Sequence, residues 1–376
     1  MSCLELKDLY DGFRDPKVIK SFQKLIALEA TKLLKPINIM EVCGGHTHTI
    51  MKYGLTQLLP NNINFIHGPG CPVCIMPKER IDHAYTLAMQ DDVILLTLGD
   101  MIKVPGSHGS LQDARSRGAD VRYLYSPMDA LKVAEENPDK KIIFFAIGFE
   151  TTTPMTAALM DSVIKRNIKN IFFHINHVTV PEAMELLVEG RDDTHCIDAF
   201  IGPAHVSVIS GAKIYEIFPK KYHIPVVVSG FEPVDVMESI YMIVKQFNEG
   251  RSDLEVQYKR LVSYEGNLKA QGLIHHYFEK VDLFKWRGIG RIPNSALRLR
   301  DEFAALNAEV IYKNILSYEE INNHKLCICG DILRGLAKPH DCTVFGTACK
   351  PTSPLGSCMI SSEGACAAYY KYGNLL

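Results

Sequence analysis

Residues that could bind metal or carry out thiol chemistry gather between positions 41 and 74, which contain E-V-C-G-G-H-T-H-T-I and H-G-P-G-C-P-V-C. Three thiols and three imidazoles fall within these 34 residues, namely Cys43, Cys71, Cys74, His46, His48 and His67. Thiolates and imidazoles together favour iron, zinc or copper over magnesium or calcium. The segment therefore predicts a transition-metal site, and its C-P-V-C resembles a redox pair.

A second group of cysteines lies near the C-terminus, at Cys327, Cys329, Cys342, Cys349, Cys358 and Cys366. Glycines and prolines separate these cysteines, so the segment buries little apolar surface and needs a cross-link, either a bound metal or disulfides, to hold it together. Four spread thiolates suit a [4Fe–4S] cluster. Structural zinc usually takes two close cysteine pairs, and several disulfides do not suit a cytosolic protein. The spacing favours the cluster, and two remaining thiols could exchange electrons with it as dithiol and disulfide.

Strand-like runs position the N-terminal thiols. The apolar runs at 37–42 and 63–66 end at or near glycines, which is typical of buried strands. Six further runs alternate with helical patterns, at 93–98, 121–125, 142–147, 171–175, 197–201 and 224–228. Strand–helix–strand units predict parallel sheets, and ligands of such sheets bind beyond the carboxyl ends of the strands.

The predicted fold is α/β, with two similar parallel-sheet domains, residues 36–125 and 126–251, flanking a cleft. This division depends on a short internal repeat, G-F-E-T at Gly148 and G-F-E-P at Gly230. The alternative is that all eight strands form one wide sheet. From residue 252 the strand–helix rhythm stops. Residues 252–376 are therefore expected to form a mainly helical or irregular [4Fe–4S] domain, on which residues 1–35 could pack. Within it, helices are expected over 256–281 and 297–311, and a loop over 286–293.

Polar side chains follow most of the predicted strands: Asp100, Glu150, Asn176, His177, His205 and Glu232. Any single one could simply cap the next helix. Together they predict a cleft lined by polar groups, including Glu150, Thr151, Thr152 and His205. The competing interpretation for the threonines is capping by Thr152 or Thr153 ahead of a proline.

Composition narrows the class of protein. The chain has 376 residues, 47% of them hydrophobic and 22% charged, with a net charge of −2, which gives no sign of binding to nucleic acid or to an anionic membrane. Its apolar runs are too short to span a bilayer, and its N-terminus has no signal-peptide pattern. We therefore expect a cytoplasmic protein whose cysteines bind metal or do redox chemistry.

The motifs together resemble the HypD family of [NiFe]-hydrogenase maturation proteins. The resemblance is carried by C-G-G-H-T-H at Cys43, G-P-G-C-P-V-C at Gly68, G-F-E-T-T-T-P at Gly148 and the tail C-x14-C-x6-C-x16-C from Cys327. It covers almost the whole chain and implies two α/β domains plus a cluster-bearing domain.

The resemblance also implies a function and partners. Proteins of this family join a small HypC-type chaperone and hold one iron while it acquires two cyanides and one carbon monoxide. A HypE-type partner delivers the cyanide, and the Fe(CN)2CO unit passes to the hydrogenase large subunit. The cluster ligands implied are Cys327, Cys342, Cys349 and Cys366. Two thiol pairs are also implied: Cys71 with Cys74 in the cleft, and Cys329 with Cys358 beside the cluster.

Cys43 is the predicted ligand of that iron. The spacing of Cys71 and Cys74 readily closes into a disulfide, whereas Cys43 has no near neighbour to pair with. A helix beginning near Thr47 would lower the pKa of the Cys43 thiol. The adjacent glycines 44 and 45 would leave room for diatomic ligands.

His46 and His48 follow Cys43 closely and are expected to support bound cyanide through hydrogen bonds. Two other functions compete with the scaffold. One is a free-standing iron–sulfur thiol–disulfide oxidoreductase, and the other is a zinc-stapled binding protein without a redox role. No P-loop or G-x-G-x-x-G occurs, so the sequence gives no support to nucleotide binding.

Overall fold

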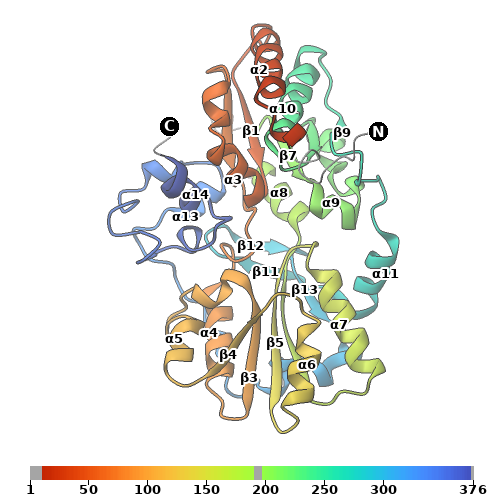
Figure 1. Ribbon diagram of the computed structural model, residues 1–376, viewed down its shortest axis with the longest axis vertical. Helices are drawn as coiled ribbons and strands as arrows, with labels where there is room; N and C mark the ends of the chain where they lie inside the picture. The colour runs from red at the N-terminus through yellow and green to blue at the C-terminus, as the bar shows by residue number, and fades with distance from the viewer. Residues whose placement is uncertain (1–10, 190–196, 374–376) are drawn as a thin grey trace.

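Parallel strands form two sheets in the computed structural model, which describes residues 11–189 and 197–373 (Figure 1). The first sheet has the strand order β2-β1-β7-β8-β9, and the second has the order β4-β3-β5-β6. Numbered within each sheet, both orders begin 2-1-3-4, as in doubly wound α/β domains. The predicted fold class, α/β with two parallel-sheet domains, is confirmed.

The strands coincide closely with the apolar runs of the sequence. The first sheet contains β1 (Ile37–Glu41), β2 (Ile63–His67), β7 (Ala199–Pro203), β8 (Val226–Ser229) and β9 (Leu254–Val256). The second contains β3 (Val93–Leu98), β4 (Asp120–Leu124), β5 (Lys141–Gly148) and β6 (Ile171–His177). In the first sheet, Ile39 pairs with Phe65 of β2 and with Ala199 of β7. Strands buried on both faces need continuous apolar sequence, which explains why the runs were recognisable.

The predicted domain boundary at residue 125 is wrong. It assigns β3 and β4 to the first domain, yet both strands belong to the second sheet. Leu95 of β3 pairs with Val121 of β4 on one side and with Ile143 of β5 on the other. The chain thus makes two strands of the first sheet, builds the second sheet over residues 93–177 and then returns at β7. The domain that carries the first sheet is therefore discontinuous in sequence.

Helices pack on both sheets. Those next to the first sheet are α2 (Pro16–Ala30), α3 (Gly44–Lys52), α8 (Val180–Glu189), α9 (Ala204–Ser210) and α10 (Pro233–Asn248). Those next to the second are α4 (Lys78–Ala88), α5 (Leu111–Ser116), α6 (Asp129–Glu136) and α7 (Thr153–Lys165). Among the described residues, no helix combines the length and the apolar character that a bilayer crossing needs.

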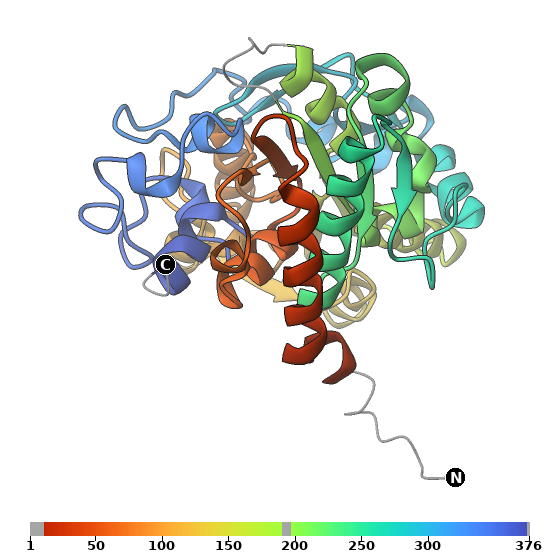
Figure 2. The same cartoon turned by 90° about the horizontal axis from the view of Figure 1, so that it is seen from above.

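Helix α2 shows how the N-terminal region is anchored. Asp15 caps it by accepting the backbone N–H of Lys17 at 2.8 Å, and Pro16 occupies its first position. The helix lies beside α10 (Figure 2), with Ile26 and Ala30 buried in a core that α10 shares. The described part of the N-terminal region therefore packs on the first sheet's domain, and its expected packing on the C-terminal domain is wrong.

The chain after β9 is less regular than the sheets. It contains α11 (Leu268–Tyr277), the paired strands β10 (Phe278–Lys280) and β13 (Leu297–Leu299), the hairpin β11 (Leu283–Trp286) and β12 (Gly290–Pro293), α12 (Ala308–Ile311), α13 (Cys329–Leu333) and α14 (Ala365–Tyr372). The helices expected over 256–281 and 297–311 are therefore only partly present, and the loop expected over 286–293 contains strands. Buried Trp286 stabilises this hairpin by donating its indole N–H to Ser295 Oγ at 2.9 Å.

Candidate functional site

Cys43 lies where doubly wound sheets bind their ligands. It follows β1, and His205 follows the neighbouring strand β7. These are the first and third strands of their sheet in chain order, so they flank the point at which the winding reverses. His205 Nε2 lies 3.9 Å from Cys43 Sγ. Two predicted site residues, 162 positions apart in the chain, are thus brought together by the topology.

The thiol of Cys43 is buried, with only 6% of the residue exposed. Burial raises its pKa, the Glu363 carboxylate raises it further, and hydrogen bonds from the backbone of Gly45 and His46 oppose the shift only in part. Helix α3 begins at Gly44, earlier than the start expected near Thr47, so Cys43 itself is the N-cap residue. The expected lowering of the Cys43 pKa is wrong because desolvation outweighs the effect of the helix terminus. Cys43 is therefore a thiol here, and metal binding must release its proton.

Phe231 is part of this site, although the amino-acid sequence gave no direct sign of its role. Its ring stacks on the His46 imidazole with centroids 4.5 Å apart and lies 4.8 Å from the His205 ring. The only signal was its place in G-F-E-P, the echo of G-F-E-T. A Cβ at Gly45 would lie 2.9 Å from the Phe231 ring, and one at Gly44 would lie 2.2 Å from a backbone oxygen of residue 363. Those two groups fill the space that the glycines were expected to leave for diatomic ligands.

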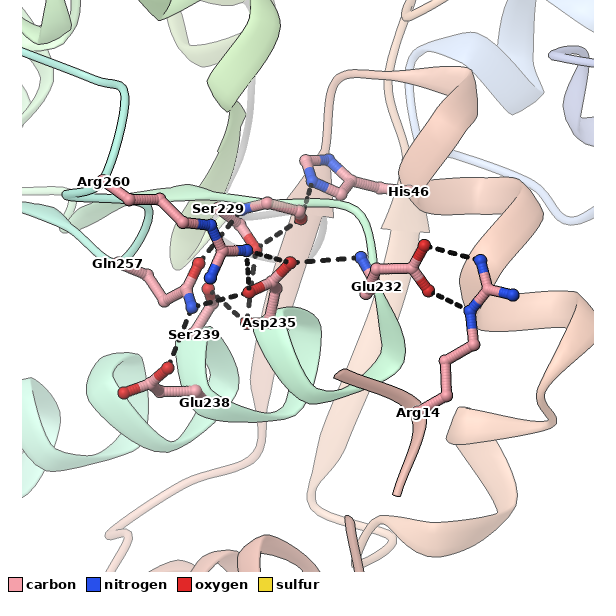
Figure 3. Close-up of polar contacts among 10 residues, drawn as sticks. Arg14, His46, Ser229, Glu232, Asp235, Glu238, Ser239, Gln257 and Arg260 are labelled. Carbon is pink, nitrogen blue, oxygen red and sulfur yellow. Dashed lines mark hydrogen bonds and ion pairs between the residues drawn. The ribbon is translucent and has the colours of Figure 1, made fainter. Parts of the chain in front are cut away.

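Hydrogen bonds fix the loop that carries Phe231 (Figure 3). His46 Nε2–H donates to the Gly230 carbonyl at 2.9 Å, and Ser229 Oγ–H donates to the same oxygen at 2.9 Å. Behind the loop, the buried Asp235 accepts hydrogen bonds from Gln257 at 2.9 Å and from Arg260 at 3.1 Å. One nitrogen of His46, Nε2, therefore holds the Phe231 loop in place. The buried Nδ1 has no hydrogen-bond partner within the described parts of the chain.

A chain of polar contacts joins the Cys43 turn to the C-terminal helix α14. Glu41 accepts the backbone N–H of Cys43 at 3.1 Å, the hydroxyl of Thr47, and His67 Nδ1–H at 2.6 Å. The other nitrogen of His67 lies 3.0 Å from the Tyr369 hydroxyl. Because these side chains are buried, the contacts tie the turn after β1 to the helix that carries Cys366.

His48 is directed away from Cys43. Its ring meets Tyr372 of α14 edge-on at 5.2 Å, with Nε2 3.5 Å from the Tyr372 hydroxyl. Residues two positions apart on a helix point in nearly opposite directions, so His46 and His48 serve different neighbours. The structure therefore does not place His48 where the sequence expected it to support bound cyanide.

Glu150 is buried in the turn after β5. One carboxylate oxygen accepts the backbone N–H of Val180 at 2.9 Å, and burial raises its pKa to about 7. Burial raises the pKa of the Tyr215 phenol, and the charge of Glu150 raises it further. Glu150 also lines a cavity of about 580 Å³ between α7, α8 and α11, together with Thr179 and Gln271.

The threonines of G-F-E-T-T-T-P act on their own turn. The hydroxyls of Thr152 and Thr153 donate to the Phe149 carbonyl at 3.2 and 3.0 Å. Thr152 is the N-cap residue of α7, but its side chain makes no capping hydrogen bond, so the competing interpretation of capping by a threonine hydroxyl is not met. Thr151 is only half buried.

Cys71 and Cys74 are joined as a disulfide in the C-P-V-C loop, residues 71–74. The loop begins next to Cys43, since the backbone N–H of Gly44 donates to the Gly70 carbonyl at 3.1 Å. Its other end meets the C-terminal region, where Ser357 Oγ–H donates to the Cys74 carbonyl at 2.5 Å. The pair thus lies between Cys43 and the second group of cysteines.

Four free cysteines lie in the cysteine-rich segment, residues 327–373. Cys342 Sγ lies 3.9 Å from the carbonyl of Leu326, the residue before Cys327, and Cys349 Sγ accepts the N–H of Leu355, which precedes the glycine packed on the Cys327 sulfur. Burial raises the pKa of Cys366, and the charges of Cys327, Cys349 and Cys342 raise it further. The other two cysteines, Cys329 and Cys358, form a disulfide. The structure therefore divides the six cysteines of this segment into four free thiols and one disulfide-bonded pair, the same division that the family pattern implies.

Gly356 links the two sets of cysteines. A Cβ at this position would lie 2.5 Å from the Cys327 sulfur and 3.7 Å from Cys329 Cβ. Only glycine leaves room there for the Cys327 side chain, so this residue belongs to the site although the sequence interpretation treated it as punctuation.

One other group of possible ligands converges among the described residues, namely His83, His174 and Glu309, whose ligand atoms lie within 4.8 Å of one another. Both Glu309 oxygens accept hydrogen bonds from Arg80, and His83 Nδ1 lies 3.2 Å from His174 Nε2. His83 Nε2–H donates to the Ser317 carbonyl at 2.7 Å. These groups satisfy one another, so the cluster is a packing network.

Comparisons with known proteins agree with the resemblance. The HypD model, described as "Hydrogenase formation hypA family", matches residues 17–373. Hydrogenase maturation factor HypD of Azotobacter vinelandii is 49% identical over 367 residues, which cover 96% of each chain. HypD2 of Bradyrhizobium diazoefficiens is 48% identical over 368 residues, again 96% of each chain. HypD of Escherichia coli K12 is 43% identical over 366 residues, which cover 96% of this chain and 97% of the relative.

Proposed function

Because the chain belongs to the HypD family of hydrogenase maturation factors, we propose that Cys43 holds the iron ion on which an Fe(CN)2CO centre is assembled. The observation that carries the proposal is the setting of Cys43 within the described residues. It is a free, buried thiol at the switch point of a doubly wound sheet, whereas Cys71 and Cys74 are paired with each other. A paired sulfur cannot hold a metal, so Cys43 is the available ligand among the three N-terminal cysteines of the motifs.

The residues around Cys43 have separate tasks in this proposal. Cys43 supplies the thiolate, and His205, with Nε2 3.9 Å from the sulfur, is placed to take the thiol proton when iron binds. Phe231 and His46 shield the sulfur from water, which would compete with cyanide and carbon monoxide for the iron. A small HypC-type chaperone would complete the coordination from outside, a HypE-type partner would bring cyanide, and the product would pass to the hydrogenase large subunit.

The resident cofactor proposed for the cysteine-rich segment is a [4Fe–4S] cluster on Cys327, Cys342, Cys349 and Cys366. All four are free thiols, and burial raises the pKa of Cys327 and of Cys366, so their thiolates are disfavoured unless a bound cluster stabilises them. A tetrahedral zinc site brings its sulfur atoms within about 4 Å of one another. Among the described residues no three of these sulfurs converge within 4.8 Å, which suits a larger cluster better than a single zinc ion. When bound, the cluster supplies one-electron transfer.

The two disulfides support a redox role beside the scaffold. Ser357, which hydrogen-bonds the carbonyl of Cys74, directly precedes Cys358 of the other pair. The segment that holds the cluster ligands therefore also contacts the C-P-V-C loop. This adjacency is the observation that favours the second candidate function, a thiol–disulfide oxidoreductase that acts without assembling a metal centre.

Replacing Cys43 distinguishes the two functions. We expect Cys43→Ala, purified anaerobically with its HypC-type partner, to lose at least tenfold of the infrared absorbance of metal-bound cyanide and carbon monoxide. Its iron–sulfur absorbance should stay unchanged, because the cluster ligands lie in another segment. Lys52→Ala, an exposed change on the same helix α3, is the matched control and should retain both signals.

Cyanide and carbon monoxide bands at wild-type intensity in Cys43→Ala would show that another group holds the iron. If the wild-type complex lacked these bands but exchanged thiols with a partner, the oxidoreductase would be the better description.

A further inference from the structure

Arg287 is a buried cation where the C-P-V-C loop meets the cysteine-rich segment. It follows β11 in the hairpin turn, and only 6% of the residue is exposed. Its backbone N–H donates to the Ile75 carbonyl at 2.7 Å, directly after the C-P-V-C loop. Its Nε–H donates to Asn323 Oδ1 at 2.9 Å, four residues before the first cluster cysteine. The residue therefore connects the two cysteine regions through backbone and side chain.

The guanidinium of Arg287 lacks a full set of partners. Its Nη1 is buried without a hydrogen-bond acceptor among the described residues. Burial lowers its pKa to about 10, and the negative charges of Cys327 and Glu79 oppose that shift. Arg287 therefore stays charged at neutral pH, and a buried charge is costly unless an opposite charge compensates it. The acidic groups that influence its charge are Glu79 and, once metal binding removes its proton, Cys327, while Lys78 adds further positive charge nearby.

The turn of the β11–β12 hairpin packs closely against the loop that carries Cys327 and Cys329. A Cβ at Gly330 would lie 2.1 Å from the Gly288 carbonyl oxygen, and one at Gly288 would lie 2.8 Å from Gly330 Cα. Gly330 directly follows Cys329. This backbone contact means that Arg287 cannot move away from Cys327 without moving the loop that holds it.

We propose that Arg287 is a positioning residue that compensates the charge of the [4Fe–4S] cluster through Cys327 and keeps the C-P-V-C loop in register with the cysteine-rich segment. This inference rests on the cluster assigned under the proposed function. A one-electron reduction adds one negative charge to the cluster and its four thiolates. A fixed cation in a poorly solvated environment stabilises that added charge, and so raises the reduction potential.

The test is a redox titration of the anaerobic holoprotein, followed by electron paramagnetic resonance. Arg287→Met keeps the length and apolar stem of the side chain but removes the charge. We expect it to shift the oxidised-to-reduced ratio at a fixed solution potential at least tenfold toward the oxidised form, which is about 59 mV for one electron. Arg287→Lys keeps the charge and should recover most of the shift.

Two further variants secure the interpretation. Arg291→Met lies in the same hairpin, but the Arg291 side chain is 61% exposed and pairs with Glu320, so this control should leave the potential unchanged. Glu79→Gln removes an anion that faces Arg287, so it should shift the potential in the opposite direction. If Arg287→Met fails to fold, Glu79→Gln still tests the sign of the effect.

The outcomes separate this inference from the proposed function. Wild-type protein without iron and sulfide would overturn the cluster assignment itself. A wild-type cluster whose potential is the same in Arg287→Met and Glu79→Gln would overturn only the role of Arg287. A tenfold shift in Arg287→Met together with recovery in Arg287→Lys would support charge compensation, whereas equal shifts in both would contradict it.

Discussion

Cys43 and Cys366 are both buried free cysteines at the start of a helix, yet different forces hold them. Cys43 is 6% exposed and joins β1 to α3, so the hydrogen bonds of a parallel sheet fix its backbone. Cys366 is 8% exposed and lies in α14, within a segment whose regular structure is limited to two short helices and brief 3-10 turns in its described part. The comparison indicates that the first site is positioned by the fold, while the second depends on what its cysteines bind.

The sharpest way to break this comparison is to replace each cysteine in turn. Cys366→Ala should lose the [4Fe–4S] cluster and the amide-exchange protection of residues 327–373, because metal binding and folding are coupled in such segments. Structural zinc, the best measured case, contributes on the order of 10 kcal/mol. Hydrogen exchange detected by mass spectrometry, together with iron and sulfide analysis, measures both effects.

Cys43→Ala is the matched control for that experiment, and its exchange pattern should match the wild type in both regions. Full iron and sulfide in Cys366→Ala would show that the segment is held in another way and would remove the contrast between the two sites.

A pH titration tests the stability of the sheet-bearing part of the molecule separately from the cysteine-rich segment. Burial raises the pKa of Glu150 to about 7 from its ordinary value of 4.5, so the folded state binds its proton more tightly than the unfolded state. The stability contributed by this group is therefore full below pH 4.5 and is lost as the pH rises through 7. Relative to Glu150→Gln, the wild type should lose about 3 kcal/mol of unfolding free energy between pH 4.5 and 8.

Urea unfolding at several pH values measures that difference. Parallel pH dependences for the wild type and Glu150→Gln would mean that the carboxyl group is solvated in the folded protein, contrary to its burial. The cluster absorbance serves as an internal control and should be the same in both proteins.

The smallest expected effect concerns the cap of α2. Asp15→Ala removes the acceptor for the Lys17 N–H and should lower the free energy of unfolding by about 1 kcal/mol. Asp15→Asn retains an acceptor and should be nearly neutral. Because α2 packs on α10, the loss should appear in the exchange of residues 16–30 and leave residues 327–373 unchanged. A change confined to the cysteine-rich segment would contradict this placement of the helix.

The sequence predicted the strands well but not their assignment to sheets. Apolar runs such as that of β5 are visible because both faces of these strands are buried, whereas the sheet that a strand joins depends on pairing across long distances. The chain leaves the first sheet after β2 and returns at β7, and no local pattern records that return. The proposed boundary at residue 125 failed for this reason.

The candidate site shows the same limit at the scale of side chains. The motifs identified Cys43, and the polar strand ends singled out His205, because loops after parallel strands share one edge. They could not tell that His48 turns to α14 while His46 turns to Phe231, since both histidines stand in one short motif. Phe231 was overlooked because an aromatic residue in a loop usually indicates packing alone.

The interrupted first sheet also sets an order of events during synthesis. Ile39 of β1 pairs with Ala199 of β7, so 160 further residues must be synthesised after Ile39 before its pairing partner is made. The second sheet lies entirely within residues 93–177 and can close earlier. Domains generally fold as units while the chain emerges. The edge of β1 next to Cys43 therefore has no partner strand available until residues 93–177 have been made.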